Sequence, residues 1–218
     1  EHYLLDDVDE IILCNDSCFC VDSLKPAFDK MDTKSCDFWS MTASNEYELH
    51  LQSFFLVVKK NLFSSELFSN YLNNVKHLDN FLEIVKTYEI PLKKTFEQKG
   101  YKGNSFIKAP EKFNPTFFPI KCMKAKMPLV KRKIFTESHA CKESLLEVIL
   151  YLKIKHNAKY KNILNYFNVN SLIPTWFKFF KPKFFAFLFR IEISSKGLVK
   201  IRILNIPFII FKRKNKNQ

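Results

Sequence analysis

The chain has 218 residues, of which 47% are hydrophobic and 16% aromatic, so it is long enough for one domain with a sizeable core and is not of disordered composition. It has only three glycines, and neither a G-x-G-x-x-G fingerprint nor a P-loop occurs, which argues against kinases, P-loop enzymes and dinucleotide-binding enzymes. The net charge of +13 is uneven: residues 1–60 carry 12 acidic and 5 basic side chains, whereas residues 61–218 carry 10 acidic and 30 basic ones.

Strands dominate the first predicted elements. Residues 8–13 are apolar and β-rich, and residues 37–42 and 50–58 predict two further strands. The last of these is nearly continuous in apolar residues, so we expect it to be buried on both faces. Residues 25–31 suit a short helix. Because a strand begins so close to the start, we expect its sheet partners to come from a preceding segment that the chain lacks.

Helical spacing replaces strand spacing after Asn61. Apolar residues recur at helical intervals in residues 67–75 and again in residues 81–92. Pro91 interrupts the second pattern, which predicts a helix that starts near Glu89 and ends at Gly100 as its C-terminal cap. Strands that alternate with helices indicate an α/β domain.

The C-terminal third differs in composition from the rest. A domain boundary is predicted near residue 140, which gives an α/β domain over residues 1–140 and a helical, basic extension over residues 141–218. Within the extension, residues 141–156 predict a helix. Residues 189–193 and 198–204 flank a Ser-Ser-Lys-Gly turn and predict a β-hairpin, and residues 207–211 predict a third short strand.

Asp16 stands just after the first predicted strand. Ligands of open α/β sheets bind at the carboxyl ends of strands, so this carboxylate is placed to meet a substrate or a metal-bound diphosphate. The alternative is that Asn15, Asp16 and Ser17 only form an Asx turn or a helix cap.

Two further polar features are candidates for substrate contact. Strand alternation points His50 and Gln52 to one face, where they suit sugar hydroxyls, although a polar strand end facing solvent explains them equally. Glu89, near the predicted helix start, is a candidate general base, or it complements the helix dipole.

Cysteines and apolar runs exclude other classes. The six cysteines show no paired zinc-ligand spacing, so we expect reduced cytosolic thiols. We also expect no secretory signal, and no apolar run reaches the roughly 20 residues of a membrane-spanning helix.

Several short motifs follow one another in a specific order. They are Cys14-Asn15-Asp16-Ser17, Asp37-Phe38-Trp39 with Thr42, His50 to Leu56, Tyr88-Glu89, Gly100-Tyr101, and Pro128-Leu129-Val130-Lys131-Arg132 with Phe135. Over about residues 3–136, this series resembles the rhamnan synthesis protein F family of bacterial polysaccharide glycosyltransferases.

The resemblance implies the acceptor-side part of a GT-A-like, Rossmann-related domain. It further implies transfer of a sugar from a nucleotide-sugar donor to a glycan or lipid-linked glycan, as in capsule, O-antigen or rhamnan synthesis. Asp16 and Glu89 would then be catalytic. The substrate-binding residues implied are Asn15, Ser17, Trp39, His50, Gln52 and Lys131. A divalent metal, Mg or Mn, would bind at Asp16, although one carboxylate in place of an Asp-any-Asp pair argues against it.

The sequence also departs from the family pattern. Residues 18–21 replace the aromatic, Gly and Pro that usually follow the Asn-Asp-Ser triplet, and Ser40 stands where Gly normally follows the Trp. The nucleotide-binding start is expected to be missing, so an inactive fragment is an open alternative.

The basic C-terminal segment calls for an anionic partner. Residues 151–218 hold 15 Lys or Arg and one acid, Glu192, interleaved with aromatic residues. An anionic membrane surface fits residues 176–214 and suggests a cytoplasmic protein on the inner face of the membrane, unless the hairpin only packs on the domain. The runner-up function is a non-catalytic basic protein that binds a membrane or nucleic acid. Nucleic acid lacks support, because no RNP, helix-turn-helix or zinc-finger pattern occurs.

Overall fold

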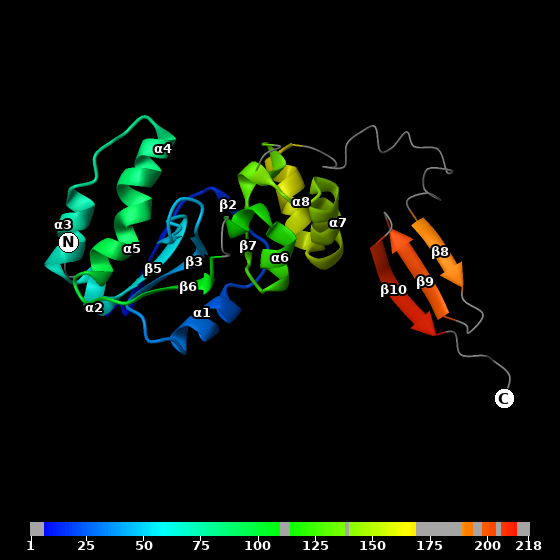
Figure 1. The fold of residues 1–218 in the computed structure, drawn as a ribbon, viewed down its shortest axis with the longest axis horizontal. Helices are drawn as coiled ribbons and strands as arrows, with labels where there is room; N and C mark the ends of the chain where they lie inside the picture. Colours follow the sequence, from blue (N-terminus) through cyan, green and yellow to red (C-terminus); the bar gives the residue numbers. More distant parts are fainter. Residues whose placement is uncertain are drawn as a thin grey trace. The chain divides into compact units, whose positions relative to one another are not determined.

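A computed structural model gives the structure of the chain, which falls into two compact units, residues 1–170 and 171–218 (Figure 1). The residues that it describes are 7–109, 114–137 and 140–168, together with three strands between residues 189 and 212. The units divide later than the boundary near residue 140 that the sequence suggested. Two helices beyond that point, α7 (Leu145–Lys155) and α8 (Asn157–Tyr166), belong to the first unit.

The first unit is built on a mixed five-stranded sheet. Its strands are β1 (Glu10–Cys14), β3 (Phe38–Ser44), β4 (His50–Leu51), β5 (Phe55–Lys59) and β6 (Gly103–Ile107). The order is β1-β5-β3-β4, all antiparallel, and β6 pairs in parallel with β3. Every residue of β3 is buried, as expected of the central strand. The predicted α/β class is confirmed.

One strand predicted over residues 50–58 is split into β4 and β5. The pairing with β3 shifts by two residues between Ala43↔Leu51 and Ser40↔Leu56, so the segment between the two strands bulges out of the ladder. Ser53 lies in this bulge and does not pair with β3. The irregularity places its backbone N–H where it can bind another part of the chain.

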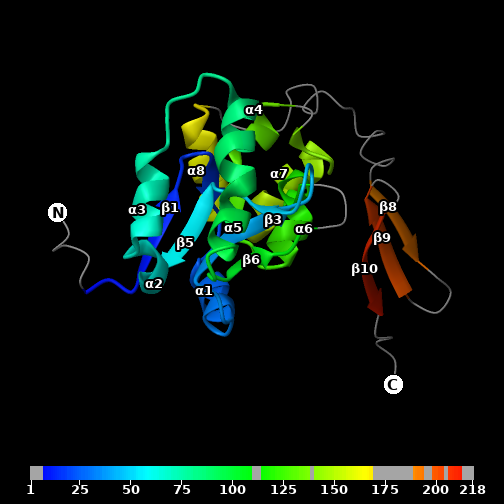
Figure 2. The ribbon, with the colours of Figure 1, turned by 60° about the vertical axis from the view of Figure 1, so that its left-hand side comes forward.

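Helices cover both faces of the sheet (Figures 1 and 2). The helices concerned are α1 (Lys25–Asp32), α2 (Lys60–Phe63), α3 (Glu66–Asn73), α5 (Ile90–Glu97) and α6 (Pro119–Lys124). Trp39 and Val57 pack with α1 and α6 in one core cluster, whereas Phe38 and Val58 pack with α2, α3 and α5 in the other. Alternate residues of β3 and β5 thus serve opposite faces, as the pleat of a strand requires.

A π-helical turn precedes α5. Short α4 (Phe81–Ile84) is followed by η2 (Val85–Glu89), in which the N–H of Ile90 donates to the Val85 carbonyl. Pro91 cannot donate an N–H and its ring crowds the preceding turn, so the wider π turn accommodates it. The sequence predicted a helix start near Glu89, and α5 does begin at Ile90 with Glu89 as its N-cap, although η2 leads into it without a break.

The end of α5 follows the prediction. Gly100 has a φ of +90°, its N–H donates to the Glu97 carbonyl, and the Tyr101 N–H donates to the Phe96 carbonyl. This pattern of hydrogen bonds is a Schellman cap, which favours glycine at the left-handed position.

Smaller elements complete the two units. Strand β2 (Cys18–Cys20) pairs antiparallel with β7 (Leu129–Lys131), which is followed by the 3₁₀ turn η4 (Arg132–Phe135); another such turn, η3 (Pro115–Phe117), precedes α6.

The second unit contains the antiparallel strands β8 (Phe189–Ile193), β9 (Leu198–Ile203) and β10 (Ile206–Lys212). They match the predicted hairpin and third strand, whereas residues 176–188 and 213–214 of the proposed membrane segment lie outside the described residues. Among the described helices, none combines the length and apolarity needed to cross a membrane.

Candidate functional site

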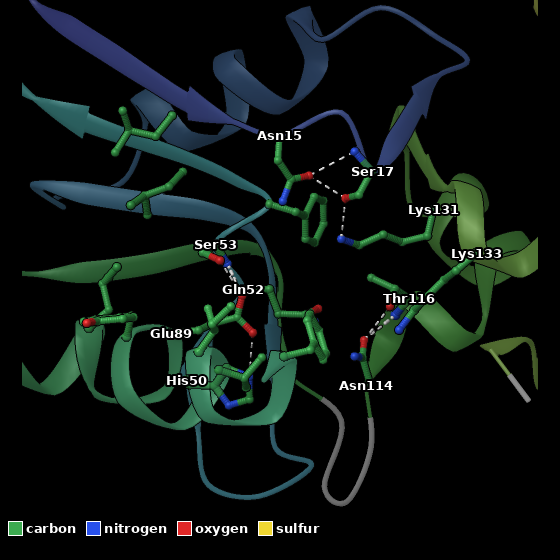
Figure 3. Close-up of a pocket in the computed structure, with 18 of the residues that line it drawn as sticks. Asn15, Ser17, His50, Gln52, Ser53, Glu89, Asn114, Thr116, Lys131 and Lys133 are labelled. Carbon is green, nitrogen blue, oxygen red and sulfur yellow. Dashed lines mark hydrogen bonds and ion pairs between the residues drawn. The ribbon is translucent and has the colours of Figure 1, made fainter. Parts of the chain in front are cut away.

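A cavity of about 990 Å³ lies in the first unit, at the end of the sheet where β1 finishes and β5 begins. Figure 3 shows its polar side chains converging from several elements. The polar and charged residues that line it include Asn15, Ser17, Glu46, His50, Gln52, Ser53, Glu89, Asn114, Thr116, Lys131, Arg132, Lys133 and Glu137. The apolar wall comes mainly from α3, α4 and η2. One cavity therefore combines an apolar surface with separate acidic and basic groups.

The turn after β1 forms one side of the cavity. The Asn15 Oδ1 accepts hydrogen bonds from the Ser17 N–H at 3.1 Å and from the Ser17 hydroxyl, so the Asx turn considered from the sequence is present. Asn15 and Ser17 line the cavity, but Asp16 does not. The Asp16 side chain is 86% exposed and accepts a hydrogen bond from Arg132 Nη1 at 3.1 Å.

Glu89 is held by the bulge between β4 and β5. Its Oε2 accepts hydrogen bonds from both the N–H and the hydroxyl of Ser53, the first at 2.7 Å. Its Oε1 lies 3.7 Å from His50 Nε2, and the side chain is only 17% exposed. Two charge-assisted bonds from one residue fix the carboxylate in orientation and leave its second oxygen facing His50 (Figure 3).

His50 is oriented from behind by the backbone. Its Nδ1 lies 2.7 Å from the Glu48 carbonyl, which can only accept, so Nδ1 carries the proton of this hydrogen bond. In the neutral ring, Nε2 is then an acceptor that faces another acceptor, Oε1 of Glu89. A proton shared between them, or a ligand hydroxyl that donates to one of them, satisfies this pair.

Gln52 and Trp39 have different environments, although both were expected to bind substrate. Gln52 lines the cavity, and its Oε1 accepts a 2.7 Å hydrogen bond from the Thr42 hydroxyl, which orients the amide. Trp39 is fully buried and packs against Phe28 and Phe55, with ring centroids 5.2 and 6.1 Å away. The structure therefore places Trp39 in the core and not in the cavity, because strand alternation turns it towards α1.

Three consecutive cations form the basic side of the cavity. Lys131 Nζ donates to Ser17 Oγ at 2.9 Å and lies 3.8 Å from the centroid of the Phe54 ring. Burial lowers the pKa of Lys131, while Cys18 and Glu89 oppose that shift. Arg132 Nη1 also donates to the Tyr166 hydroxyl at 2.6 Å.

The sequence indicated only part of this arrangement. Lys131 was named through its motif, whereas Arg132 and Lys133 were visible as a basic run without an assigned role. Ser53 lay within the His50 to Leu56 motif without an assigned role, and Tyr166 was not named. They act through partners 36 and 34 positions away in the sequence, and no local pattern reports such contacts.

Asp16, the metal ligand suggested from the sequence, is paired with a cation in the structure. Across the described ranges, no group of three or more His, Cys, Asp or Glu side chains is arranged to hold a metal ion. The carboxylate of Asp16 is already bound to Arg132.

Comparison with known proteins gives one match. Searches of curated protein sequences and of solved structures found none. The family model for rhamnan synthesis protein F matches residues 3–195, which is most of the chain and extends past the motifs that carried the resemblance. The chain therefore belongs to the rhamnan synthesis protein F family, whose description ties it to the synthesis of rhamnan polysaccharide.

Proposed function

We propose that this chain transfers a sugar from a nucleotide-sugar donor to a growing surface polysaccharide, with Glu89 as the general base. The observation that carries the proposal is the placement of the Glu89 carboxylate, which is shielded, held by Ser53 at one oxygen and directed towards His50 at the other, inside a cavity. A general base must be positioned before its pKa matters, and the two bonds from Ser53 supply that position.

In the proposed reaction, a hydroxyl of the glycan or lipid-linked glycan acceptor donates its proton to Oε1 of Glu89. The acceptor oxygen forms a bond to the anomeric carbon of the donor as the bond from that carbon to the diphosphate oxygen breaks. The diphosphate leaves with the electron pair of the broken bond, so no further proton is required. A single displacement of this kind inverts the configuration at the anomeric carbon.

His50 and Gln52 are proposed to bind sugar hydroxyls. His50 presents Nε2 beside Oε1 of Glu89, 3.7 Å away, so a hydroxyl that enters there meets two acceptors. Gln52 has its carbonyl end held by Thr42, and its amide is thereby oriented in the cavity wall. A site that pairs with substrate hydroxyls rejects analogues that lack them, because its own polar groups are then left unpaired.

The proposal is tested with Glu89→Gln, which keeps the size of the side chain but removes its basicity. We expect turnover of a nucleotide sugar with a glycan acceptor to fall about 10²- to 10⁴-fold with a much smaller change in KM. Glu83→Gln is the matched control, because Glu83 is an exposed residue of α4 that does not line the cavity. Near-normal turnover in Glu89→Gln, or an equal loss in Glu83→Gln, would contradict the role of Glu89. Absence of transfer by the unaltered chain with every nucleotide sugar tried would overturn the proposed function itself.

A further inference from the structure

The basic side of the cavity has a geometry that the transfer of a proton to Glu89 does not explain. Strand β7 pairs with β2, and this pairing sets Lys131 opposite Cys18 and within hydrogen-bond distance of Ser17. The turn η4 begins immediately afterwards with Arg132 and Lys133. All three side chains line the same cavity, which also contains the carboxylates of Glu46, Glu89 and Glu137.

The contacts of Lys131 indicate a site that gains from binding an anion. Its ammonium donates to a neutral hydroxyl and lies over an aromatic ring, and the carboxylate of Glu89 acts on it only electrostatically, without a direct ion pair among the described contacts. Burial lowers its pKa, which means that the charged form is poorly solvated where it lies. An anion next to Nζ would replace the solvation that burial removes. An ammonium has three N–H donors, so donors remain after the bond to Ser17.

Arg132 also has donors to spare. One nitrogen of its guanidinium, Nη1, serves both the exposed Asp16 and the Tyr166 hydroxyl. A guanidinium carries five N–H donors in a planar fork, which matches phosphate oxygens in pairs. The contacts to Asp16 and Tyr166 therefore hold the group in place without using all of its donors.

We infer that Lys131, Arg132 and Lys133 form a metal-independent subsite for a diphosphate ester. The inference rests on the proposed function only for the identity of the ester, which is the diphosphate of a nucleotide-sugar donor or of an isoprenyl lipid carrier. Fixed cations stabilise negative charge that develops on a leaving diphosphate, and this is the task that a divalent metal performs in other sites. The described residues supply the cations and no set of metal ligands.

Binding of diphosphates to the full chain in the presence of EDTA tests the subsite. Isothermal titration calorimetry is carried out with three ligands. Pyrophosphate represents the diphosphate alone, uridine diphosphate represents the nucleotide-sugar donor, and farnesyl diphosphate represents the isoprenyl lipid carrier. We expect one-to-one binding without metal for at least one ester, and at least about tenfold weaker binding in the double variant Lys131→Gln, Lys133→Gln. A stronger response to uridine diphosphate identifies the donor, and a stronger response to farnesyl diphosphate identifies the lipid carrier.

The control must account for the many other lysines, because residues 151–218 alone hold 15 Lys or Arg. The double variant Lys153→Gln, Lys159→Gln removes the same charge from exposed positions on α7 and α8. Equal weakening in both double variants, or binding that appears only when Mg²⁺ is added, would overturn the subsite. Because binding is measured without turnover, an inactive Glu89→Gln variant that still binds the ester separates this inference from the proposed base.

Discussion

Asp16 and Glu89 are two carboxylates that looked equally suited to catalysis in the sequence but differ in exposure and contacts in the structure. Both sit at the junction of regular elements, and both belong to motifs of the family series. Asp16 projects into solvent with 86% of its side chain exposed and holds Arg132 from outside the cavity. Glu89 is largely shielded, lines the cavity and receives two hydrogen bonds from Ser53.

The difference arises from two irregularities that meet at Glu89. The bulge between β4 and β5 turns Ser53 out of the ladder, and the π turn before Pro91 brings Glu89 to it. Bulges and π turns are frequent at functional sites, because they re-aim side chains that regular geometry would leave elsewhere. Asp16 lies in an ordinary Asx turn, where the local hydrogen bonds belong to its neighbours. Glu89 therefore differs from Asp16 because a distant segment of the chain holds its carboxylate in place. Its position next to a regular element would not have distinguished it.

Among variants that keep the charge of Glu89, the largest expected effect comes from shortening its side chain. Glu89→Asp draws the carboxylate back by one methylene, so the oxygen that faces His50 no longer reaches the acceptor hydroxyl, or the contacts with Ser53 must break. We expect turnover to fall about 10²-fold, since a misplacement of about 1 Å has that cost. Initial rates under saturating donor and acceptor measure it. Turnover within threefold of the unaltered chain would mean that position is not what sets Glu89 apart from Asp16.

A smaller loss is expected when Glu89 is kept and its support is weakened. Ser53→Ala removes the hydroxyl that binds Oε2 but retains the backbone N–H bond at 2.7 Å. One hydrogen bond to a charged group contributes about 1.5–3 kcal/mol, part of which the remaining bond retains, so we expect roughly a tenfold loss of turnover. Ser53→Thr keeps the hydroxyl and should recover most of the rate. If Ser53→Ala and Ser53→Thr are equally slow, the bulge acts through its shape and not through this bond.

Much of the fold follows from local patterns in the sequence. The strand near residues 8–13, the helix over residues 25–31 and the C-terminal hairpin each depend on the periodicity of one segment, and the structure contains all three. The break between β4 and β5 depends on how that segment pairs with β3, so its continuous apolar pattern could not reveal it. Helix α8 was also missed, because it buries only Tyr160 and Ile163 and shows little helical pattern.

The sequence motifs predicted several residues of the candidate site whose side chains line the cavity. Asn15, Ser17, His50, Gln52 and Glu89 were named, and all of them line the cavity. Trp39 was named in the same way, but a motif does not state which face of a strand a side chain occupies. The partners that prepare the site, such as Ser53 for Glu89, are set by tertiary contacts that only the fold supplies.

A modest effect on stability is expected from the contact that anchors the π turn. The Tyr71 hydroxyl donates to the Tyr88 carbonyl at 2.6 Å, next to Glu89, and burial raises the pKa of Tyr71 to about 12, with Tyr88 adding to the shift. In Tyr71→Phe we expect a loss of about 1 kcal/mol near neutral pH, or a melting temperature about 2–4 °C lower.

The pH dependence of that difference has a definite sign. A raised pKa means that the folded chain keeps a proton that the unfolded chain releases near pH 10, so the contribution of Tyr71 is complete below pH 10 and is lost as the pH rises towards 12. The gap in melting temperature between the unaltered chain and Tyr71→Phe should therefore narrow over this range. A gap that stays constant or widens between pH 10 and 12 would contradict the assignment of the proton to Tyr71.

The smallest expected effect, and the one whose sign is most informative, is that of Asp16→Asn. As an exposed ion pair with Arg132, Asp16 contributes about 0–1 kcal/mol to stability, so the melting temperature should hardly change. Weakening the pair frees the Arg132 guanidinium, and we expect the affinity for a diphosphate ester in EDTA to stay equal or to rise by up to about fivefold.

Asp29→Asn is the matched control, because it removes one exposed charge that is paired with Lys25 on α1 and does not line the cavity. If Asp16 instead held a metal for the diphosphate, the variant would lose binding in Mg²⁺ and gain none in EDTA. Titration of both variants with and without Mg²⁺ thus decides whether this carboxylate restrains Arg132 or serves the ligand directly.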